Sequence, residues 1–444
     1  MKIILLSGGS GKRLWPLSND ARSKQFLRLL TGPDGKKESM IQRVVRQIKA
    51  AGITDDITVA TGINQKDSIE NQLGNETSVV TEPCRRDTFP AIVLACSYLE
   101  SIGVDNDEPI IVMPCDQYTD DNYFYTVKEM GEAVKNNVAD LILMGIKPTY
   151  PSSKYGYIVP CNDSSPQNIK KVDYFTEKPD VGKAHSLISQ GAVWNGGVFA
   201  FRLGYLMDIA GKYTKNADFK TIREHYDELP RISFDYEVAE KAKSVAVIEY
   251  DGQWKDLGTW NTLTDEISTR AFGNVVLKNS DSSYVYNELE IPVVCIGAED
   301  MVIAATYDGV LVSKRSQTED IKNIVSDLGK RPMYEERRWG EYKVIDYLEF
   351  PDGFAALTKQ LTLHPGKSIS YQRHNCRSEV WTFVSGEGLI VIDGEIRRVS
   401  RGDVINIAVG QLHALKAITP LTFIEVQSGA NLVEEDIERF DWKW

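Results

Sequence analysis

Short apolar runs alternate with amphipathic stretches along the first 146 residues. The apolar runs have the length and branched side chains of buried strands, and the stretches between them carry apolar residues at helical spacing. The expected strands are residues 2–6, 57–60, 109–113 and 141–146, and the expected helices are residues 39–51, 88–99 and 123–134. We expect Gly52 to end the first helix and Thr88 to cap the second.

This alternation predicts a mostly parallel, doubly wound α/β sheet. Ligands of such sheets bind beyond the carboxyl ends of the strands. The segments in which we expect chemistry are therefore residues 7–13, residues 82–88 and Asp116.

Beyond residue 270 the pattern changes to short β-rich runs. The elements expected there are strands at 275–277, 293–296, 302–305 and 310–312, a helix at 318–328 and a polar linker at 327–338. From residue 339 to residue 428, short strands are separated by glycine turns, a spacing that predicts a small β-sandwich or barrel. These turns lie at Gly366, Gly386, Gly394 and Gly402.

The pattern as a whole divides the chain into three expected parts. Residues 1–268 form the α/β domain, residues 269–330 a β-rich connecting segment, and residues 335–444 the C-terminal β domain. A length of 444 residues suits about three domains.

Composition and charge narrow the class of protein. Hydrophobic residues make up 42% and charged residues 26%, which is ordinary for a soluble globular protein. With 51 basic and 63 acidic residues the net charge is −12, so nucleic acid is not an expected partner, although a focused basic cluster could bind a small anion. The six cysteines form no CxxC pair, which favours reduced thiols in the cytoplasm. The apolar runs are too short for a signal peptide or a membrane span, so no membrane association is expected.

The loop after the first expected strand is rich in glycine. Residues 7–14 read SGGSGKRL, and such a loop lets backbone N–H groups approach an anion closely. A Walker A motif ending at Lys12 would need glycine at Leu6, and a dinucleotide fingerprint would need glycine at Leu14. Taken alone, the loop could equally be a tight strand-to-helix turn.

The longer string around this loop is more specific. Residues 8–17 (GGSGKRLWPL) and 24–27 (KQFL) closely resemble the signature of sugar-1-phosphate nucleotidyltransferases, above all the mannose-1-phosphate guanylyltransferases. Further matches follow in the family's order at 82–91 (EPCRRDTFPA), 113–116 (MPCD), 145–149 (GIKPT), 155–157 (YGY), 177–179 (EKP), 194–199 (WNGGVF), 233–236 (SFDY) and 254–260 (WKDLGTW). The resemblance covers residues 1–265 and implies a Rossmann-like nucleotidyltransferase domain. The chain departs from the family at Asp87, where Asn is usual, and at Gly196.

The resemblance implies that GTP and mannose 1-phosphate are converted to GDP-mannose and pyrophosphate. Such transfer is catalysed mostly by positioning and charge neutralisation. Catalytic roles are implied for Arg13, Lys24 and Lys178, whose cationic groups suit phosphate oxygens. The residues implied at the nucleotide are Gly8, Gly9, Gly11, Lys12, Arg13, Glu82, Arg86 and Thr88.

Metal and sugar-phosphate sites are implied in the same way. Asp116 and Asp256 would hold Mg²⁺, a hard cation that prefers oxygen ligands. The residues implied at the sugar phosphate are Gly156, Glu177, Lys178, Asn195 and Asp235. From the residues alone, Asp116 could equally cap a turn, and the pair Asn195-Gly196 is a strong hairpin signal.

A second constellation lies in the C-terminal part. Its spacing resembles the two cupin motifs, with Gln372 in place of the first histidine. The ligands expected for Zn²⁺ or a similar divalent ion are Gln372, His374, Glu379 and His413. Cys376 is a weaker candidate for the same pocket.

This part also resembles the isomerase half of bifunctional mannose-6-phosphate isomerase/mannose-1-phosphate guanylyltransferases. The shared segments are residues 338–340 (RWG), 424–429 (IEVQSG) and 435–440 (EDIERF). The family's HHHRAEHW reads HNCRSEVW at residues 374–381, so Asn375, Cys376 and Val380 stand in place of three histidines. We therefore expect bound metal but weak or absent isomerisation of mannose 6-phosphate to fructose 6-phosphate, because Val380 cannot transfer a proton.

Arg377 remains as a candidate for contact with the phosphate or an oxyanion. A cupin that serves only packing or dimerisation is the alternative, since a fold does not guarantee a function. For the whole chain the alternatives are a transferase for another sugar 1-phosphate, such as a heptose, or another NTP, and a sugar-binding regulatory protein. A homodimer is expected from the resemblance alone.

Overall fold

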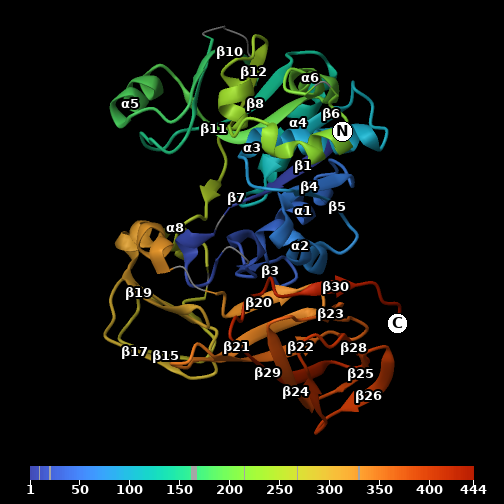
Figure 1. Ribbon diagram of the computed structural model, residues 1–444. Coiled ribbons are helices and arrows are strands. Elements are labelled where there is room, and N and C mark those ends of the chain that lie inside the picture. The colour runs from blue at the N-terminus through green and yellow to red at the C-terminus, as the bar shows by residue number, and fades with distance from the viewer. Residues whose placement is uncertain (10, 20–21, 162–167, 215, 268, 329–330) are drawn as a thin grey trace. The chain divides into compact units, whose positions relative to one another are not determined.

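The computed structural model describes residues 1–9, 11–19, 22–161, 168–214, 216–267, 269–328 and 331–444 (Figure 1). They form two compact units. The first contains residues 1–14 and 23–268, and the second contains residues 15–22 and 269–444. A short stretch near the N-terminus therefore folds with the C-terminal part of the chain.

A nine-stranded sheet runs through the first unit in the order β5-β4-β1-β6-β11-β8-β12-β10-β9. Its strands are β1 (Lys2–Ser7), β4 (Ile57–Gly62), β5 (Ser78–Glu82), β6 (Pro109–Pro114), β8 (Leu141–Ile146), β9 (Tyr157–Pro160), β10 (Ile169–Thr176), β11 (Val193–Arg202) and β12 (Val245–Tyr250). The pairs β5–β4, β4–β1, β1–β6 and β8–β12 are parallel, and β11 is antiparallel to both of its neighbours β6 and β8. The four expected strands are confirmed as β1, β4, β6 and β8.

Helices cover both faces of this sheet, which confirms the doubly wound α/β class. Ile3 and Leu5 of β1 pack in one core with α1 (Met40–Ala50) and α4 (Asp121–Lys135), whereas Ile4 packs in a second core with α3 (Thr88–Ser101) and α6 (Leu203–Ala210). Successive strand residues point to opposite faces, so a strand covered on both sides needs a continuous apolar run. The other helices are α2 (Lys66–Leu73), α5 (Val181–Ser189), α7 (Phe219–Glu224) and α8 (Trp260–Thr264). Two short pairs lie outside the sheet, β2 (Leu30–Thr31) with β3 (Lys37–Glu38) and β7 (Gln117–Thr119) with β13 (Trp254–Asp256).

Local side-chain chemistry sets the helix ends. Gly52 ends α1 with a positive φ of 61°, as expected. Thr88 is not the cap of α3: Asp87 caps it by accepting a hydrogen bond from the Thr88 backbone N–H at 2.8 Å. The Thr88 hydroxyl instead accepts from the Phe234 N–H at 2.9 Å, so it fastens a distant segment. Among the described residues, none of the helices is both long enough and apolar enough to cross a membrane.

The second unit begins with a coil of short strands. They are β14 (Ala271–Phe272), β15 (Val275–Lys278), β16 (Tyr284–Asn287), β17 (Val293–Ile296), β18 (Met301–Thr306) and β19 (Gly309–Lys314). The four expected strands are confirmed, and their pairing is parallel except between β18 and β19. The single helix expected at 318–328 is wrong: a 3-10 turn at Arg315–Asp320, α9 (Ile321–Val325) and a second turn at Ser326–Leu328 replace it. Only Thr318 and Ile321 are buried among the residues described there, too few to hold a longer helix.

Two antiparallel sheets form the rest of the second unit, in the orders β20-β21-β22-β29-β24-β27 and β26-β25-β28-β23-β30, which confirms the expected β-sandwich or barrel. The strands are β20 (Tyr334–Arg337), β21 (Gly340–Glu349), β22 (Ala355–Leu363), β23 (Tyr371–Arg373), β24 (Arg377–Ser385), β25 (Glu387–Ile392), β26 (Glu395–Ser400), β27 (Val404–Ile407), β28 (His413–Ala417), β29 (Leu421–Gly429) and β30 (Glu438–Phe440). The linker expected at 327–338 is wrong in part, because β20 is a strand that pairs with β21. Its polar sequence gave no sign of a strand.

Strand β24 shows how this domain positions a polar site. Arg377, Glu379, Trp381 and Phe383 are buried, whereas Val380 between them is exposed. The buried positions are polar at the start of the strand and aromatic further along it, where they join the apolar core. Charged side chains therefore meet inside the barrel at one end of that core.

Candidate functional site

A cavity of about 610 Å³ opens at the carboxyl ends of β1, β4, β5 and β6. Its position is the one expected for a ligand of a doubly wound sheet. Six predicted site residues line it, namely Gly8, Gly9, Glu82, Arg86, Thr88 and Asp116. Asn64 and Gln65 line it as well and were missed by the sequence reasoning. They follow β4, so their place after a strand end was the signal that could have identified them.

Buried amides hold the glycine-rich loop in shape. Gly9 has a φ of 125°, a backbone conformation that side chains disfavour. Its carbonyl accepts hydrogen bonds from Ser23 Oγ at 3.2 Å and from Gln65 Nε2 at 3.4 Å. Gln25 Nε2 donates to Ser7 Oγ at 3.1 Å. These hydrogen bonds thus fix the conformation of the loop, and its backbone groups lie beside the cavity.

The predicted residues Gly11, Lys12 and Arg13 continue this loop. Gly11 also has a positive φ, of 60°, and Leu14 N–H donates to its carbonyl at 3.1 Å. Lys12 and Arg13 lie in the 3-10 turn that follows, and the Arg13 side chain is exposed. An exposed guanidinium two residues beyond the glycines is available to a phosphate group.

Lys24, Asp116 and Asp256 meet at one point. Lys24 Nζ lies 2.8 Å from Asp116 Oδ2 and 3.0 Å from Asp256 Oδ1. Asp256 reaches this point because β13 pairs with β7, with Asp256 opposite Gln117. Burial acts to lower the pKa of Lys24, but the two carboxylates raise it well above its ordinary value. Two carboxylates therefore converge on a single cation at the edge of the cavity.

The five residues predicted at the sugar phosphate also come together. Glu177 Oε1 lies 2.7 Å from Lys178 Nζ, and Asn195 Nδ2 donates to Asp235 Oδ1 at 2.6 Å. The Gly156 carbonyl accepts from Asn195 N–H at 2.8 Å, and a Cβ on Gly156 would lie 2.4 Å from Glu177 Oε2. Glycine at this position therefore leaves room for the carboxylate.

Burial and charge change the pKa of Asp235 in this cluster. Burial, and then the negative charge of Glu177, raise the pKa of Asp235 to about 6. Lys178 is 55% exposed, so its ammonium can reach a ligand while it contacts Glu177. The hairpin turn considered for Asn195-Gly196 is absent, because both residues lie within β11 at a bulge.

Glu82 and Arg86 line the cavity but also fasten a neighbouring segment. Tyr226 Oη donates to Glu82 Oε2 at 2.6 Å, and Arg86 Nε donates to the Leu229 carbonyl at 2.8 Å. Burial raises the pKa of Glu82. Both side chains therefore have a structural role whatever they bind.

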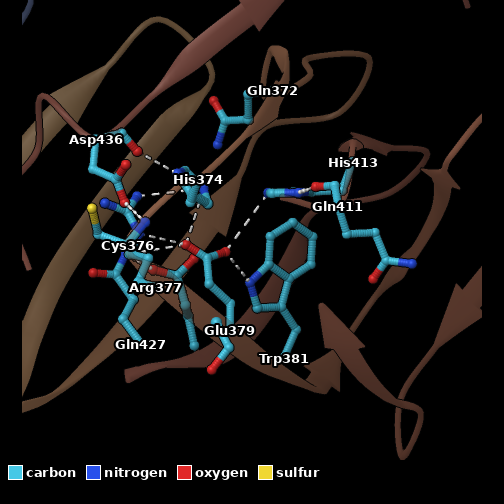
Figure 2. A network of polar contacts seen from close by, with 12 residues as sticks. Gln372, His374, Cys376, Arg377, Glu379, Trp381, Gln411, His413, Gln427 and Asp436 are labelled. Carbon is cyan, nitrogen blue, oxygen red and sulfur yellow. Dashed lines mark hydrogen bonds and ion pairs between the residues drawn. The ribbon is translucent and has the colours of Figure 1, made fainter. Parts of the chain in front are cut away.

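In the β domain, His374, Glu379 and His413 form a buried cluster (Figure 2). One ligand atom from each lies within 4.8 Å of the others. Nδ1 of His374 lies 2.6 Å from the Asp436 carbonyl and Nδ1 of His413 lies 3.0 Å from the Gln411 carbonyl. Both Nδ1 atoms must donate these bonds, so both Nε2 lone pairs face Glu379.

This donor set fits a divalent metal. Burial is the main factor that lowers the pKa of both histidines to about 4, so both rings are neutral at pH 7. His413 Nε2 is buried without a hydrogen-bond partner among the described residues. Neutral imidazoles and a carboxylate are suitable ligands for zinc and similar ions.

Arg377 contacts two of the side chains that could bind the metal. Its Nε donates to Glu379 Oε1 at 3.0 Å, Nη2 lies 3.4 Å from His374 Nε2, and Nη1 donates to the Val433 carbonyl at 2.9 Å. Trp381 Nε1 donates to Glu379 Oε2 at 3.1 Å, a contact missed from the sequence. The guanidinium thus neutralises Glu379 from inside the barrel.

Gln372 is buried beside the cluster, because β23 pairs with β28 and places Gln372 opposite His413. Gln372 Oε1 accepts from Ser370 Oγ at 2.7 Å, and Figure 2 draws no bond from Gln372 to the histidines or Glu379. Asn375, Cys376 and Val380 are all exposed. The reason given for weak isomerase activity is therefore wrong, because β24 points residue 380 out of the barrel and a histidine there would not face Glu379.

Comparison with known proteins finds family models that match nearly the whole chain. The family model described as nucleotidyl transferase matches residues 2–271, the one described as MannoseP isomerase/GMP-like beta-helix domain matches 273–328, and the one described as mannose-6-phosphate isomerase C-terminal matches 330–442. The chain is 30% identical over 474 residues to the mannose-1-phosphate guanylyltransferase of Escherichia coli K12, covering 98% of this chain and 97% of the relative. It is 32% identical to the xanthan biosynthesis protein XanB of Xanthomonas campestris, covering 99% and 97%.

A solved structure is similar as well. The crystal structure described as mannose-1-phosphate geranyltransferase from Thermus thermophilus has a TM-score of 0.62 and 27% sequence identity. The match covers 74% of this chain and 98% of that one.

The raised pKa of Asp235 gives a test in solution. Because the folded pKa of about 6 exceeds the unfolded value of about 3.9, burial of this carboxyl group destabilises the fold progressively as the pH rises from about 4 to about 6, and by a constant amount above that. We expect Asp235→Asn to raise the free energy of unfolding at pH 7.5 by at most about 3 kcal/mol, with about half of that gain left at pH 5 and almost none below about pH 3. Urea unfolding of both proteins across this range measures the effect. Asp208→Asn, at an exposed site on α6, is the control, and a gain for Asp235→Asn that ignores pH would contradict the burial effect.

Proposed function

This chain belongs to the family of mannose-1-phosphate guanylyltransferases and is a nucleotidyltransferase, and from that premise we propose how its own residues carry out GDP-mannose synthesis. The observation that carries the proposal is the convergence of Lys24, Asp116 and Asp256 at the edge of a cavity formed by the glycine-rich loop. Carboxylates and cations gathered in this way suit a nucleoside triphosphate. The substrates we propose are GTP and mannose 1-phosphate.

In the proposed reaction a phosphate oxygen of mannose 1-phosphate attacks the α-phosphorus of GTP. The bond from that phosphorus to the bridging oxygen breaks, and pyrophosphate leaves. Arg13 and backbone N–H groups of Gly8 and Gly9 bind triphosphate oxygens, and Lys24 neutralises charge at the same place. Lys178 binds the sugar phosphate, while Glu177, Asn195 and Asp235 accept or donate hydrogen bonds at sugar hydroxyls.

Asp116 and Asp256 are suitable ligands for Mg²⁺. One oxygen of each already contacts the Lys24 ammonium, and hard carboxylate oxygens are what this ion prefers. Bound there, the ion would neutralise charge on the phosphates. Lys24 would keep the two carboxylates oriented beside such an ion.

The direct test is a panel of substrates. We expect GTP with mannose 1-phosphate to give GDP-mannose and pyrophosphate only when Mg²⁺ is present, because the phosphates need charge neutralisation. Pyrophosphate release across the four common NTPs, each with mannose 1-phosphate and a heptose 1-phosphate, measures it. Good turnover with another NTP and none with GTP would replace the assigned nucleotide.

Single substitutions test the residue roles. We expect Arg13→Ala, Lys178→Ala and Asp256→Ala each to lower the transfer rate by about 10²–10³-fold, because each removes a charge aimed at phosphates or their metal. Lys178→Ala should act mainly at limiting mannose 1-phosphate. Steady-state kinetics on folded protein measure these effects, and Arg28→Ala, an exposed arginine four residues after Lys24, should stay within about twofold. Unchanged kinetics for Lys178→Ala would remove it from the sugar-phosphate site.

For the β domain we propose a divalent metal bound by His374, Glu379 and His413, with Gln372, opposite His413, as the fourth ligand. We expect isomerase activity to be weak, because the Arg377 guanidinium holds His374 and Glu379. A metal would have to displace it from His374 Nε2.

Removing that competitor should strengthen metal binding. We expect Arg377→Met to raise zinc affinity by about tenfold, since Glu379 then lacks its compensating charge. Competition with a chromophoric chelator measures it, with Arg373→Met, an arginine bound to Glu438 at the surface, as control. The coupled fructose 6-phosphate assay is run on the same samples. No zinc in either wild type or Arg377→Met would refute the ligand set.

A further inference from the structure

Residues 15–22 interrupt the first unit. The chain leaves that unit after Leu14, directly after Arg13, and returns to it at Ser23, directly before Lys24. Between these points it folds with the β-rich residues of the second unit. The segment therefore connects two cations of the proposed phosphate site.

A bidentate ion pair holds one end of the segment. Arg22 Nη1 donates to Glu288 Oε2 at 2.9 Å and Arg22 Nη2 donates to Glu288 Oε1 at 2.8 Å. The two side chains are only 20% and 16% exposed. The guanidinium also lies 5.2 Å from the centre of the Tyr334 ring. Such paired bonds fix orientation as well as distance.

Further contacts hold the other end. Asn19 Nδ2 donates to Asp308 Oδ2 at 2.7 Å, and the second oxygen of Asp308 accepts from Met333 N–H at 2.7 Å. Thr306 Oγ1 donates to the Pro16 carbonyl at 3.2 Å. A Cβ on Gly309 would lie 2.6 Å from the Trp15 ring, so only glycine permits this approach. The segment is thus fastened at several points along its length.

We propose that Glu288 and Arg22 are positioning residues for the transferase, and that together with Asn19 and Asp308 they clamp residues 15–22 so that Arg13 and Lys24 are held ready for the phosphates. This inference rests on the proposed guanylyltransferase function. A small displacement of a catalytic group costs about 10²-fold in rate. The β-rich segment 273–328 then contributes to catalysis without touching substrate.

The test uses the full chain with Glu288→Ala and Glu288→Gln. We expect Glu288→Ala to lower kcat at least about tenfold and to raise the Mg²⁺ concentration needed for half-maximal rate, because Lys24 shares Asp116 and Asp256. The KM for mannose 1-phosphate should stay within about twofold, since its proposed residues lie outside the segment. Glu288→Gln, which keeps one acceptor oxygen, should fall between Glu288→Ala and wild type.

The matched control is Arg315→Met. Arg315 lies 3.8 Å from Asp300 and 5.3 Å from the Tyr284 ring centre, so it repeats the same kinds of contact elsewhere in the β-rich segment. Its kcat should match wild type. If Glu288→Ala has a lower melting temperature but an unchanged kcat, Glu288 only stabilises the fold, and the proposal is overturned.

A second readout does not depend on activity. Limited trypsin digestion, followed by mass spectrometry, should cut Glu288→Ala after Arg13, Arg22 or Lys24 several-fold faster than wild type or Arg315→Met. Equal cleavage would overturn the clamp even if the wild type proved inactive with GTP. Faster cleavage in a chain that turns over no sugar 1-phosphate would support the clamp and refute the proposed function instead.

Discussion

Two carboxylates held beside one another need a positive charge between them, and the first unit is arranged around this requirement. Asp116 follows β6 and Asp256 ends β13, yet the pairing of β13 with β7 brings them to the same ammonium group. At an effective dielectric of about 20, two like charges about 4 Å apart repel by about 4 kcal/mol. Lys24 offsets this repulsion, and it can do so only if the chain around it is fixed. The amides of Gln25 and Gln65, bonded to Ser7, Ser23 and Gly9, supply that rigidity.

In the β domain a carboxylate also needs a positive charge beside it, but there the carboxylate is buried. Glu379 is 2% exposed, whereas Asp116 and Asp256 are 29% and 37% exposed. A carboxylate at the edge of a cavity can exchange its cation with a ligand from solvent, but one inside a barrel cannot be left unpaired without a cost of about 3–5 kcal/mol. Arg377 and Trp381 supply the charge and the hydrogen bond that Glu379 needs. A ligand that binds Glu379 must therefore compete with the contacts that this carboxylate already makes, whereas His413 Nε2 has no hydrogen-bond partner among the described residues.

Strands of the doubly wound sheet could be predicted because each is a continuous apolar run covered on both faces. The short strand β20 could not, since Tyr334–Arg337 is a polar run whose partner, β21, only the fold reveals. Residues grouped by family motifs, such as Glu177, Asn195 and Asp235, do lie together. The motifs do not show which cation lies between Asp116 and Asp256. They also do not show that Tyr226 donates a hydrogen bond to Glu82. Both contacts join segments that are far apart in sequence. The positions of Asn64 and Gln65 were accessible in principle, since both follow a predicted strand.

Differences from a family motif must be weighed by the face on which they fall. In residues 374–381 the letters shared with the isomerase motif are His374, Arg377, Glu379 and Trp381, and all four side chains are buried. Of the four changed positions, Asn375, Cys376 and Val380 are exposed and Ser378 is half-buried. Asn375 and Cys376 lie in the bend before β24, and residues within β24 alternate between its faces, so half of the motif's letters differ here while the four shared ones stay buried. The chemistry that this domain retains therefore depends on its inward residues, and on how firmly Arg377 holds them, rather than on the substitutions that first distinguish the chain from its relatives.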